Sequence, residues 1–492
     1  YWTSIKIMKK AILFCMTALL ALTTYSQEKK WTLQECVQYA IDNNINIQQT
    51  ELDLETAAID RSDAIGAFLP SLNGTASNSW QTGLTQNVLT GVLETQQTRN
   101  SSFGVSSGVR LINGFRNHKV LDRAELSKIA ADYNIAKLKD DVALNVAVSY
   151  LQVLLAKESA KVIVAQNAVT KEQIERTQEL VDGGVLPRGD LLEIRATDAS
   201  ERQRIVAAEN AVSIGLVNLA QLLNIKDFAN FDIAEGEYEV QGEGILDTQA
   251  EVLIETAKET RYDLKIAAQN EAIAKKDLEI SKTGFYPTLD AFFNYNTRES
   301  NRSSGFNTSI DPDNPFIDSG NPIGVVGNTG DIVTSLSPNI TGVDEIGPLP
   351  FVEQLYLNDG ISYGLSLRVP VFNGFSVKNQ VKRSEVNVMR SEFQKELAEQ
   401  NLRTAVYQAY TDAKAARESY EAAKIAVESQ ELAYAYAKDR YDVGLTNAFD
   451  FSQSKLRYDN AQIEIARAKY DYIFRIKVLE LYFGVPATEL KF

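Results

Sequence analysis

The chain has 492 residues, of which 44% are hydrophobic and 23% are charged, a composition typical of folded proteins. Its formal net charge of −15 argues against nucleic acid as a partner, because phosphates are recognised by basic surfaces. The sequence contains one histidine, His118, and no phosphate-binding loop or ligand set with metal-binding spacing. We therefore expect a protein that is not an enzyme and that holds no metal and no cofactor.

The N-terminus has the pattern of an export signal. Lys9 and Lys10 precede an apolar run over 11–22. A basic start followed by about a dozen apolar residues is typical of a cleaved signal peptide, and the run is too short to span a bilayer. We assign residues 1–26 to this signal peptide. Cys36 is then the one cysteine that remains, so no intramolecular disulfide is expected.

Two runs in the first half of the chain alternate between apolar and polar residues, which predicts β-strands. The apolar positions are Leu72, Gly74, Ala76 and Trp80 in the first run, and Phe103, Val105, Val109 and Leu111 in the second. A helical pattern over 31–66 precedes them, and its Thr32 and Glu35 have the spacing of a capping box. A polar loop is expected over 82–101, between the two strands.

A long helical hairpin follows these strands. Residues 116–181 contain no proline or glycine, and their apolar residues recur every three or four positions. This pattern predicts one helix of roughly 100 Å. A turn over 181–190 leads into a second helix over 191–223, which folds back along the first. Because an average helix has about a dozen residues, a helix of this length indicates a protein that spans a distance.

The second half of the chain repeats this plan. The triplet Asn-Gly-Phe occurs at 113–115 and again at 373–375, an offset of 260 residues, and Phe-x-Pro occurs at 68–70 and 285–287. We expect a helix over 250–284, a strand over 289–296, a long loop over 298–358 and a second strand over 361–369. A helical hairpin over 377–441 and 449–483 follows. The predicted parts are a first structural repeat over 27–225, an acidic equatorial connector over 226–248 and a second repeat over 249–492.

The four alternating runs have the length of membrane strands. Tilted strands of about ten residues cross a bilayer when their apolar residues face lipid. A half-buried sheet in a soluble domain shows the same alternation, but the export signal, the aromatic residues in the runs and the long loops on one side favour the membrane. Four strands cannot close a barrel, because open edges leave backbone groups without hydrogen bonds in lipid. We therefore expect several copies to share one barrel, continued by a tube of packed helices.

The duplicated unit, the Phe-x-Pro junctions, the Asn-Gly-Phe turns and the glycine-containing hairpin tips together resemble the TolC family of outer-membrane efflux proteins. The resemblance covers essentially the whole chain after the signal peptide. It implies an α+β membrane fold in which a homotrimer forms a twelve-stranded β-barrel in the outer membrane of a Gram-negative bacterium and an antiparallel coiled-coil tunnel in the periplasm. It also implies docking to a periplasmic adaptor protein and, through it, to an inner-membrane RND or ABC transporter.

The resemblance implies a gate at the two hairpin tips. Family members narrow the tunnel there with rings of aspartate, and Asp190 and Asp450 each stand six residues after a tip glycine. Tyr441 matches a tyrosine that latches the second tip, but Thr446 stands where the latching arginine would be, and Arg188 of the first tip is a candidate to replace it. An aspartate just after a turn is also common as a helix N-cap, worth about 1 kcal/mol. An N-cap or first-turn role for Asp190 and Asp450 is the structural alternative, and it is compatible with a gate role.

The same comparison implies an adaptor-docking surface at the tips. Its expected members are Gly184 and Leu186 of the first tip and Gly444 and Leu445 of the second. For the two glycines, a purely conformational role is the alternative, because glycine adopts a positive φ in a tight turn at little cost.

Three functions agree with these patterns to different extents. A passive export duct for small molecules such as drugs, driven by an inner-membrane pump, is the leading hypothesis. A duct for type I protein secretion in the same family is the first alternative. An exported trimeric coiled-coil scaffold would explain the long helices but not the four strands between them. Few methionines and one histidine argue against a soft-metal exporter.

Overall fold

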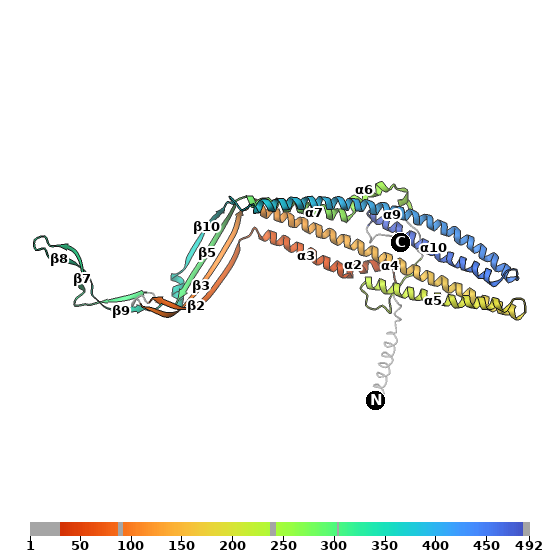
Figure 1. Ribbon diagram of the computed structural model, residues 1–492, viewed down its shortest axis with the longest axis horizontal. Coiled ribbons are helices and arrows are strands. Elements are labelled where there is room, and N and C mark those ends of the chain that lie inside the picture. The colour runs from red at the N-terminus through yellow and green to blue at the C-terminus, as the bar shows by residue number, and fades with distance from the viewer. Residues whose placement is uncertain (1–29, 87–91, 237–242, 303–304, 486–492) are drawn as a thin grey trace, which may run out of the picture. The chain divides into compact units, whose positions relative to one another are not determined.

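The computed structural model describes residues 30–86, 92–236, 243–302 and 305–485 (Figure 1). The predicted signal peptide lies outside the described residues. The described chain forms two compact units, each assembled from separate segments. Among the described residues, the helical unit consists of the segment that ends at Arg61, the segment Arg123–Lys275 and the segment that begins at Ser384. The strand unit consists of the segments Ser62–Asp122 and Lys276–Arg383. The sequence repeats with their boundaries at 225 and 249 stay a prediction, and each unit takes segments from both.

The elements have the following bounds. The helices are α2 (Leu33–Asn43), α3 (Ile45–Gly66), α4 (Arg116–Asp182), α5 (Arg188–Leu222), α6 (Ala250–Thr260), α7 (Tyr262–Lys282), α8 (Phe351–Leu357), α9 (Ser376–Asp442) and α10 (Ala448–Tyr482), with short 3₁₀ turns at Glu243–Asp247 and Thr283–Phe285. The strands are β1 (Lys30–Trp31), β2 (Ser71–Gln86), β3 (Leu93–Ile112), β4 (Asp232–Ile233), β5 (Thr288–Ser300), β6 (Gly305–Ile310), β7 (Phe316–Val325), β8 (Ile332–Pro338), β9 (Ile340–Ile346) and β10 (Gly360–Arg368).

The long helices are confirmed. Helices α4 and α9 each contain 67 residues, and α5 and α10 each contain 35. The first and last residues of α9 and α10 follow those of α4 and α5 by 260 positions. The residues with positive φ before and after each long helix show the same offset, Phe115 with Phe375 and Gly184 with Gly444. Figure 1 shows each pair, α4 with α5 and α9 with α10, as an antiparallel hairpin.

Two predicted helices are divided in the structure. The backbone becomes extended at Asn44, where ψ is 124°, and at Arg261, where ψ is 132°. These residues separate α2 from α3 and α6 from α7, so the predictions of single helices over 31–66 and 250–284 are wrong at these points. Neither break carries a proline or a glycine. At the first break, Asn44 Oδ1 accepts hydrogen bonds from Asn46 N at 2.9 Å and from Ile47 N at 3.3 Å, so this asparagine is the N-cap of α3 and is a local signal that the helical pattern concealed.

The core of the helical unit forms where α2 packs on the middle of α4. Helix α2 begins with the predicted capping box, in which Thr32 Oγ1 accepts a hydrogen bond from Glu35 N at 3.3 Å and the Glu35 carboxylate accepts one from Thr32 N at 3.0 Å. Its apolar face buries Cys36 and Ala40 completely. Tyr150 of α4 is also fully buried, and its Oη lies 3.1 Å from the Trp31 carbonyl oxygen and 2.9 Å from that of Ala234, at the paired strands β1 and β4.

The strand unit contains a four-stranded antiparallel sheet in the order β10-β5-β3-β2. The register brings the apolar positions of all four strands onto one face. One row across the sheet consists of Gly74, Val105, Tyr295 and Ile361. The neighbouring row, on the opposite face, consists of Asn73, Ser106, Asn294 and Ser362. The apolar face is open in this chain, with Leu72 76% exposed and Tyr363 80% exposed.

Two predicted loops are wrong. Over 82–101, β2 continues to Gln86 and β3 begins at Leu93, and the two strands stay paired up to their ends. Most residues in this stretch are polar on both faces, so hydrophobic alternation could not reveal the strand. Over 298–358, two further antiparallel ribbons form, β6 with β9 and β7 with β8, followed by α8. The side chain of Gln354 in α8 fastens this helix to β5, where it bonds both backbone groups of Ser300.

The hydroxyl of Tyr150 provides a test of the core. Tyr150→Phe keeps the ring but leaves two buried carbonyl oxygens without this partner, and we expect a loss of about 1 kcal/mol in the free energy of unfolding. Thermal unfolding followed by circular dichroism measures this effect. Tyr407→Phe is the matched control, because Tyr407 is 56% exposed. Equal melting temperatures for the two variants would contradict the assignment.

Candidate functional site

The two hairpin tips have the same backbone geometry. Gly184 has φ of +72° and Gly444 has φ of +74°, a conformation in which a Cβ atom is strained. In the first tip Val185 N donates to the Leu180 carbonyl oxygen at 2.8 Å, and in the second Leu445 N donates to that of Arg440, also at 2.8 Å. These bonds satisfy carbonyl groups at the ends of α4 and α9. The conformational role expected of the glycines is therefore present in the structure.

Asp190 and Asp450 both occupy the first turn of a returning helix. Asp450 N donates to Asn447 Oδ1 at 2.8 Å, so Asn447 is the N-cap of α10. Pro187 stands at the matching place before α5 and supplies no side-chain cap. Neither aspartate is therefore the N-cap residue, and of the N-cap or first-turn role expected of them the structure shows the first-turn one, with each carboxylate near the positive end of a helix. Asp450 is exposed and Asp190 is half-buried.

Tyr441 lies in a small apolar cluster that joins the two hairpins. The cluster consists of Ile194, Tyr441, Ala448 and Phe451, with Ile174, Leu186 and Tyr434 packed against it. The Tyr441 ring is 1% exposed and stacks on the Phe451 ring at 4.9 Å. Its hydroxyl oxygen lies 3.0 Å from Thr177 Oγ1 of α4. Burial raises the pKa of Tyr441, so the hydroxyl stays protonated at neutral pH and contributes a neutral hydrogen bond.

The expected arginine contact is not formed by Arg188. Arg188 is exposed in the first turn of α5, and no ion pair is recorded for it in the described part of the chain. A different arginine makes a contact between the hairpins. Arg176 Nε of α4 lies 3.3 Å from the carboxylate of Asp442 at the end of α9. No family motif pointed to Arg176, because its position became informative only when α4 and α9 were placed side by side.

The four tip residues expected to meet an adaptor differ in exposure. Leu445 is 70% exposed, whereas Leu186 is half-buried against the Tyr441 cluster. Val185, which is 260 positions before Leu445, is 64% exposed and is the structural counterpart of Leu445. The exposed apolar surface of the tips therefore includes Val185, which the sequence comparison missed.

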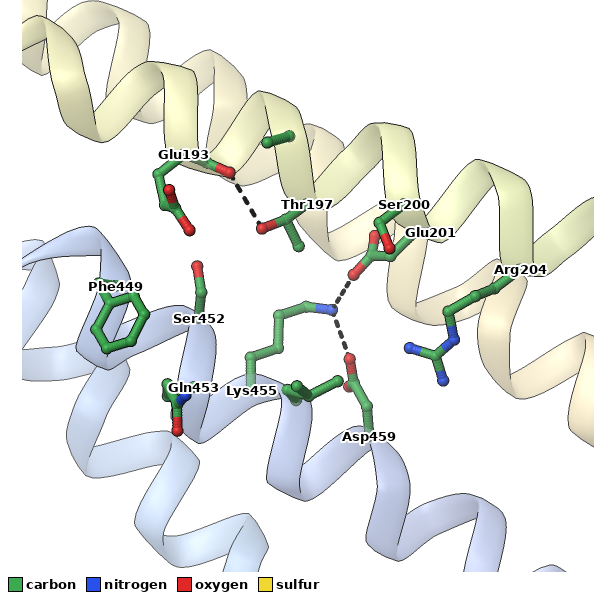
Figure 2. A pocket seen from close by; sticks show the side chains of 12 residues that line it. Glu193, Thr197, Ser200, Glu201, Arg204, Phe449, Ser452, Gln453, Lys455 and Asp459 are labelled. Carbon is green, nitrogen blue, oxygen red and sulfur yellow. Dashed lines mark hydrogen bonds and ion pairs between the residues drawn. The ribbon is translucent and has the colours of Figure 1, made fainter.

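A buried polar cluster lies between α5 and α10, a few turns from the tips (Figure 2). Lys455 Nζ of α10 lies 2.8 Å from Glu201 Oε1 of α5 and 2.9 Å from Asp459 Oδ2 of its own helix. All three side chains are 5% exposed. They line part of a cavity of about 340 Å³ whose wall also includes Arg204. A lysine on an amphipathic helix usually lies in solvent, so nothing in the sequence marked Lys455 as buried.

The described residues contain no group of three or more His, Cys, Asp or Glu side chains placed to hold a metal ion. What the geometry offers is a pair of hairpin tips joined by an apolar cluster and a few polar contacts, with one carboxylate in the first turn of each returning helix.

Comparison with known proteins identifies the family that has this architecture. A family model described as outer membrane efflux protein matches residues 36–224 and 357–484, well over half of the chain. The outer membrane protein TolC of Vibrio cholerae is 22% identical over 386 residues, which cover 75% of this chain and 73% of the relative. TolC of Escherichia coli is 21% identical over 454 residues, covering 90% and 80% of the two chains.

A solved structure shows the same fold. The CmeC outer membrane channel of Campylobacter jejuni superimposes with a TM-score of 0.70, covering 92% of this chain and 85% of that one, at 17% sequence identity. The fold class predicted from the sequence, long antiparallel helices combined with four strands of a TolC-like channel, is confirmed.

The left-handed tip conformation provides a first test. Gly444→Ala places a Cβ at φ of +74°, which costs about 1–2 kcal/mol in that conformation. We expect faster hydrogen exchange over 441–450 in the variant. Gly189→Ala is the control, since Gly189 lies inside α5, where alanine favours the helix. Equal exchange rates in both variants would show that the tip conformation is unstrained.

The Tyr441 cluster provides a second test. Tyr441→Ala removes a buried ring and should cost about 3–5 kcal/mol, while Tyr441→Phe loses only the hydrogen bond to Thr177, about 1 kcal/mol. Denaturant midpoints of the purified protein measure both. Tyr436→Ala is the control, because Tyr436 is 70% exposed. A Tyr441→Ala midpoint equal to that of Tyr436→Ala would place the ring outside the tip core.

Proposed function

Because the chain belongs to the outer membrane efflux protein family, we propose that it is the outer-membrane duct of a tripartite efflux system. Channels of this family work with a periplasmic adaptor and an inner-membrane pump. The chain itself supplies a passive path, and the energy comes from the pump. The observation that carries the proposal is the four-stranded sheet, which has one mainly apolar face and one mainly polar face.

The apolar face of the sheet suits contact with lipid. Large side chains such as Leu72, Tyr363 and Leu365 are each more than 60% exposed in the single chain, an arrangement that is costly in water. The polar face carries serine and asparagine rows and the ion pair between Arg110 and Asp290, whose Nε and Oδ1 atoms are 2.8 Å apart. An apolar outer face and a polar lumen are the pattern of outer-membrane barrels.

The edges of the sheet support an oligomer. Strands β2 and β10 each have a neighbour on one side only, so a single sheet in lipid would leave a row of backbone groups unsatisfied. Pairing β2 of one copy with β10 of the next closes the barrel. Three copies give twelve strands, and we propose this homotrimer on the strength of the family.

The helices supply a second surface for the same assembly. Helix α5 contains the one stretch among the described helices that is apolar and long enough to cross a membrane, yet only 11% of that stretch is buried. Its exposed apolar residues include Val206, Ile214 and Val217. In an oligomer these side chains pack against helices of a neighbouring copy, which removes them from water and builds the wall of the tunnel.

The gate is proposed at the tips. Asp190 and Asp450 are one turn into α5 and α10, and a ring of copies repeats each carboxylate by symmetry. Crowded carboxylates favour cations over anions in a narrow pore. Tyr441 and its hydrogen bond to Thr177 hold the two tips together. The ion pair of Arg176 with Asp442 supplies the arginine contact that was expected of Arg188. Val185 and Leu445 are the apolar tip residues proposed to meet the adaptor, with Gly184 and Gly444 shaping the turn and Leu186 packed beneath it.

Two alternatives remain distinct from this proposal. A type I secretion duct has the same architecture. Another relative of this chain is Protein CyaE of Bordetella pertussis, which is 24% identical over 328 residues that cover 66% of this chain and 58% of the relative. An exported coiled-coil scaffold does not account for a sheet with an apolar face. A scaffold would be released from outer membranes without detergent, whereas a duct requires detergent for extraction.

The gate is tested by conductance of the purified protein in a planar bilayer. We expect a small, cation-selective conductance from the native protein and a weaker preference for cations in the variant Asp190→Ala/Asp450→Ala, because the carboxylates are gone. Asp60→Ala/Asp63→Ala on α3 is the control, since it removes the same charge from two exposed positions outside the tips. Unchanged selectivity in the tip variant would remove the aspartates from the gate.

A further inference from the structure

The inference concerns the buried cluster centred on Lys455. This lysine belongs to the second hairpin, and the nearest carboxylate outside its own helix, that of Glu201, belongs to the first (Figure 2). Among the ion pairs of the described residues that join the two hairpins, this is the one in which both side chains are buried, at 5% exposure each. The pair between Arg176 and Asp442 is far more open, with Arg176 53% exposed.

Glu201 is fixed from a third helix as well. Asn167 Nδ2 of α4 donates to Glu201 Oε2 at 3.1 Å, and Thr170 Oγ1 donates to Glu201 Oε1 at 2.9 Å. Asn167 Nδ2 also lies 2.9 Å from Asp198 Oδ1, and Arg202 neutralises Asp198 at 2.7 Å. The carboxylate that pairs with Lys455 is therefore held in position by side chains of the first hairpin.

Asp459 completes the cluster on the side of α10. Its backbone carbonyl oxygen accepts a hydrogen bond from Gln166 Nε2 of α4 at 3.2 Å, so this turn of α10 is attached to the first hairpin at two places. Burial raises the pKa of the Asp459 carboxyl, while Lys455 opposes this effect. The ammonium group of Lys455 favours the charged form of this carboxyl, against the larger effect of burial.

We propose that Lys455 is a positioning residue of the gate, which holds α10 against α5 and limits how far the two hairpin tips can separate. The role rests on the proposed function as a duct. Lys455 lies five residues after Asp450 and Glu201 eleven after Asp190, or about 8 Å and 17 Å along their helices. If the tips separate so far that α10 leaves α5 at Lys455, the buried ammonium group loses its carboxylate partner. A buried charge without a partner is strongly destabilising. The tip contacts can therefore open while the cluster stays closed.

The proposal is tested by exchanging the two charges. Lys455→Glu leaves three acidic groups together, and Glu201→Lys leaves two cations beside one carboxylate. In both single variants we expect a several-fold increase in conductance and faster hydrogen exchange over 188–201 and 448–459. The double variant Lys455→Glu/Glu201→Lys restores one cation and two carboxylates, and we expect both quantities to return toward the native values. Rescue of this kind is not expected if the lysine only fills space.

The matched control is Arg467→Glu, which makes the same charge change on α10. Arg467 pairs with Glu464 of its own helix, and their side chains are 70% and 64% exposed. We expect native conductance and native exchange from this variant. Should Lys455→Glu fail to assemble, Lys455→Gln takes its place, since it removes the charge and keeps a hydrogen-bond donor.

The outcomes separate the two proposals. Native exchange and native conductance in Lys455→Glu would overturn the positioning role, and so would faster exchange without a change in conductance, since the contact would then not limit the opening. A failure of the double variant to restore either quantity would also overturn it. If the native protein shows no conductance even with tip variants, the duct itself fails and the gate role falls with it. Exchange over 188–201 would then still report whether Lys455 joins the hairpins.

Discussion

The structure depends on the need of a sheet in lipid to satisfy all its backbone hydrogen bonds. The sheet in the order β10-β5-β3-β2 pairs its inner strands on both sides and leaves two outer edges, and large side chains on its apolar face, such as Leu72 and Tyr363, are exposed among the described residues. A closed barrel is the arrangement that removes such edges in a bilayer. Four strands are too few to close one, and this is the physical reason for the oligomer proposed above.

The helices meet a different constraint, because they lie in water and must bury an apolar stripe along more than sixty residues. Each long helix pairs with a shorter antiparallel partner, and this leaves apolar residues such as Ile214 of α5 and Phe393 of α9 on the surface. Packing against neighbouring copies covers such stripes in coiled coils. The proposed oligomer would therefore pair the edges of the sheet and also cover the open faces of the helices.

Between the hairpins the contacts change from apolar to charged. The middle of the helical unit is held by full burial of residues such as Tyr150 and Leu219, whereas the contacts near the tips consist of a small aromatic cluster, a hydrogen bond and a few ion pairs. Polar contacts of this kind break at a lower cost than an apolar core and require specific geometry. The tips are thus suited to separate while the middle of the unit stays packed.

The sequence by itself determined the elements whose signal is local. The period of α4 and α9 ran without interruption for 67 residues, and the Asn-Gly-Phe triplets and the tip glycines marked positions where the backbone requires positive φ. Thr32 and Glu35 could be identified as a capping box because both partners lie within one turn.

Only the tertiary structure decided which residues meet across elements. The strand over Thr82–Gln86 exists because β3 pairs with it, Asn447 rather than Asp450 caps α10, and Lys455 is buried because α5 brings Glu201 to it. Lys455 and Glu201 are 254 residues apart in the sequence. The residues next to a side chain in the sequence give no information about a partner that is so distant along the chain.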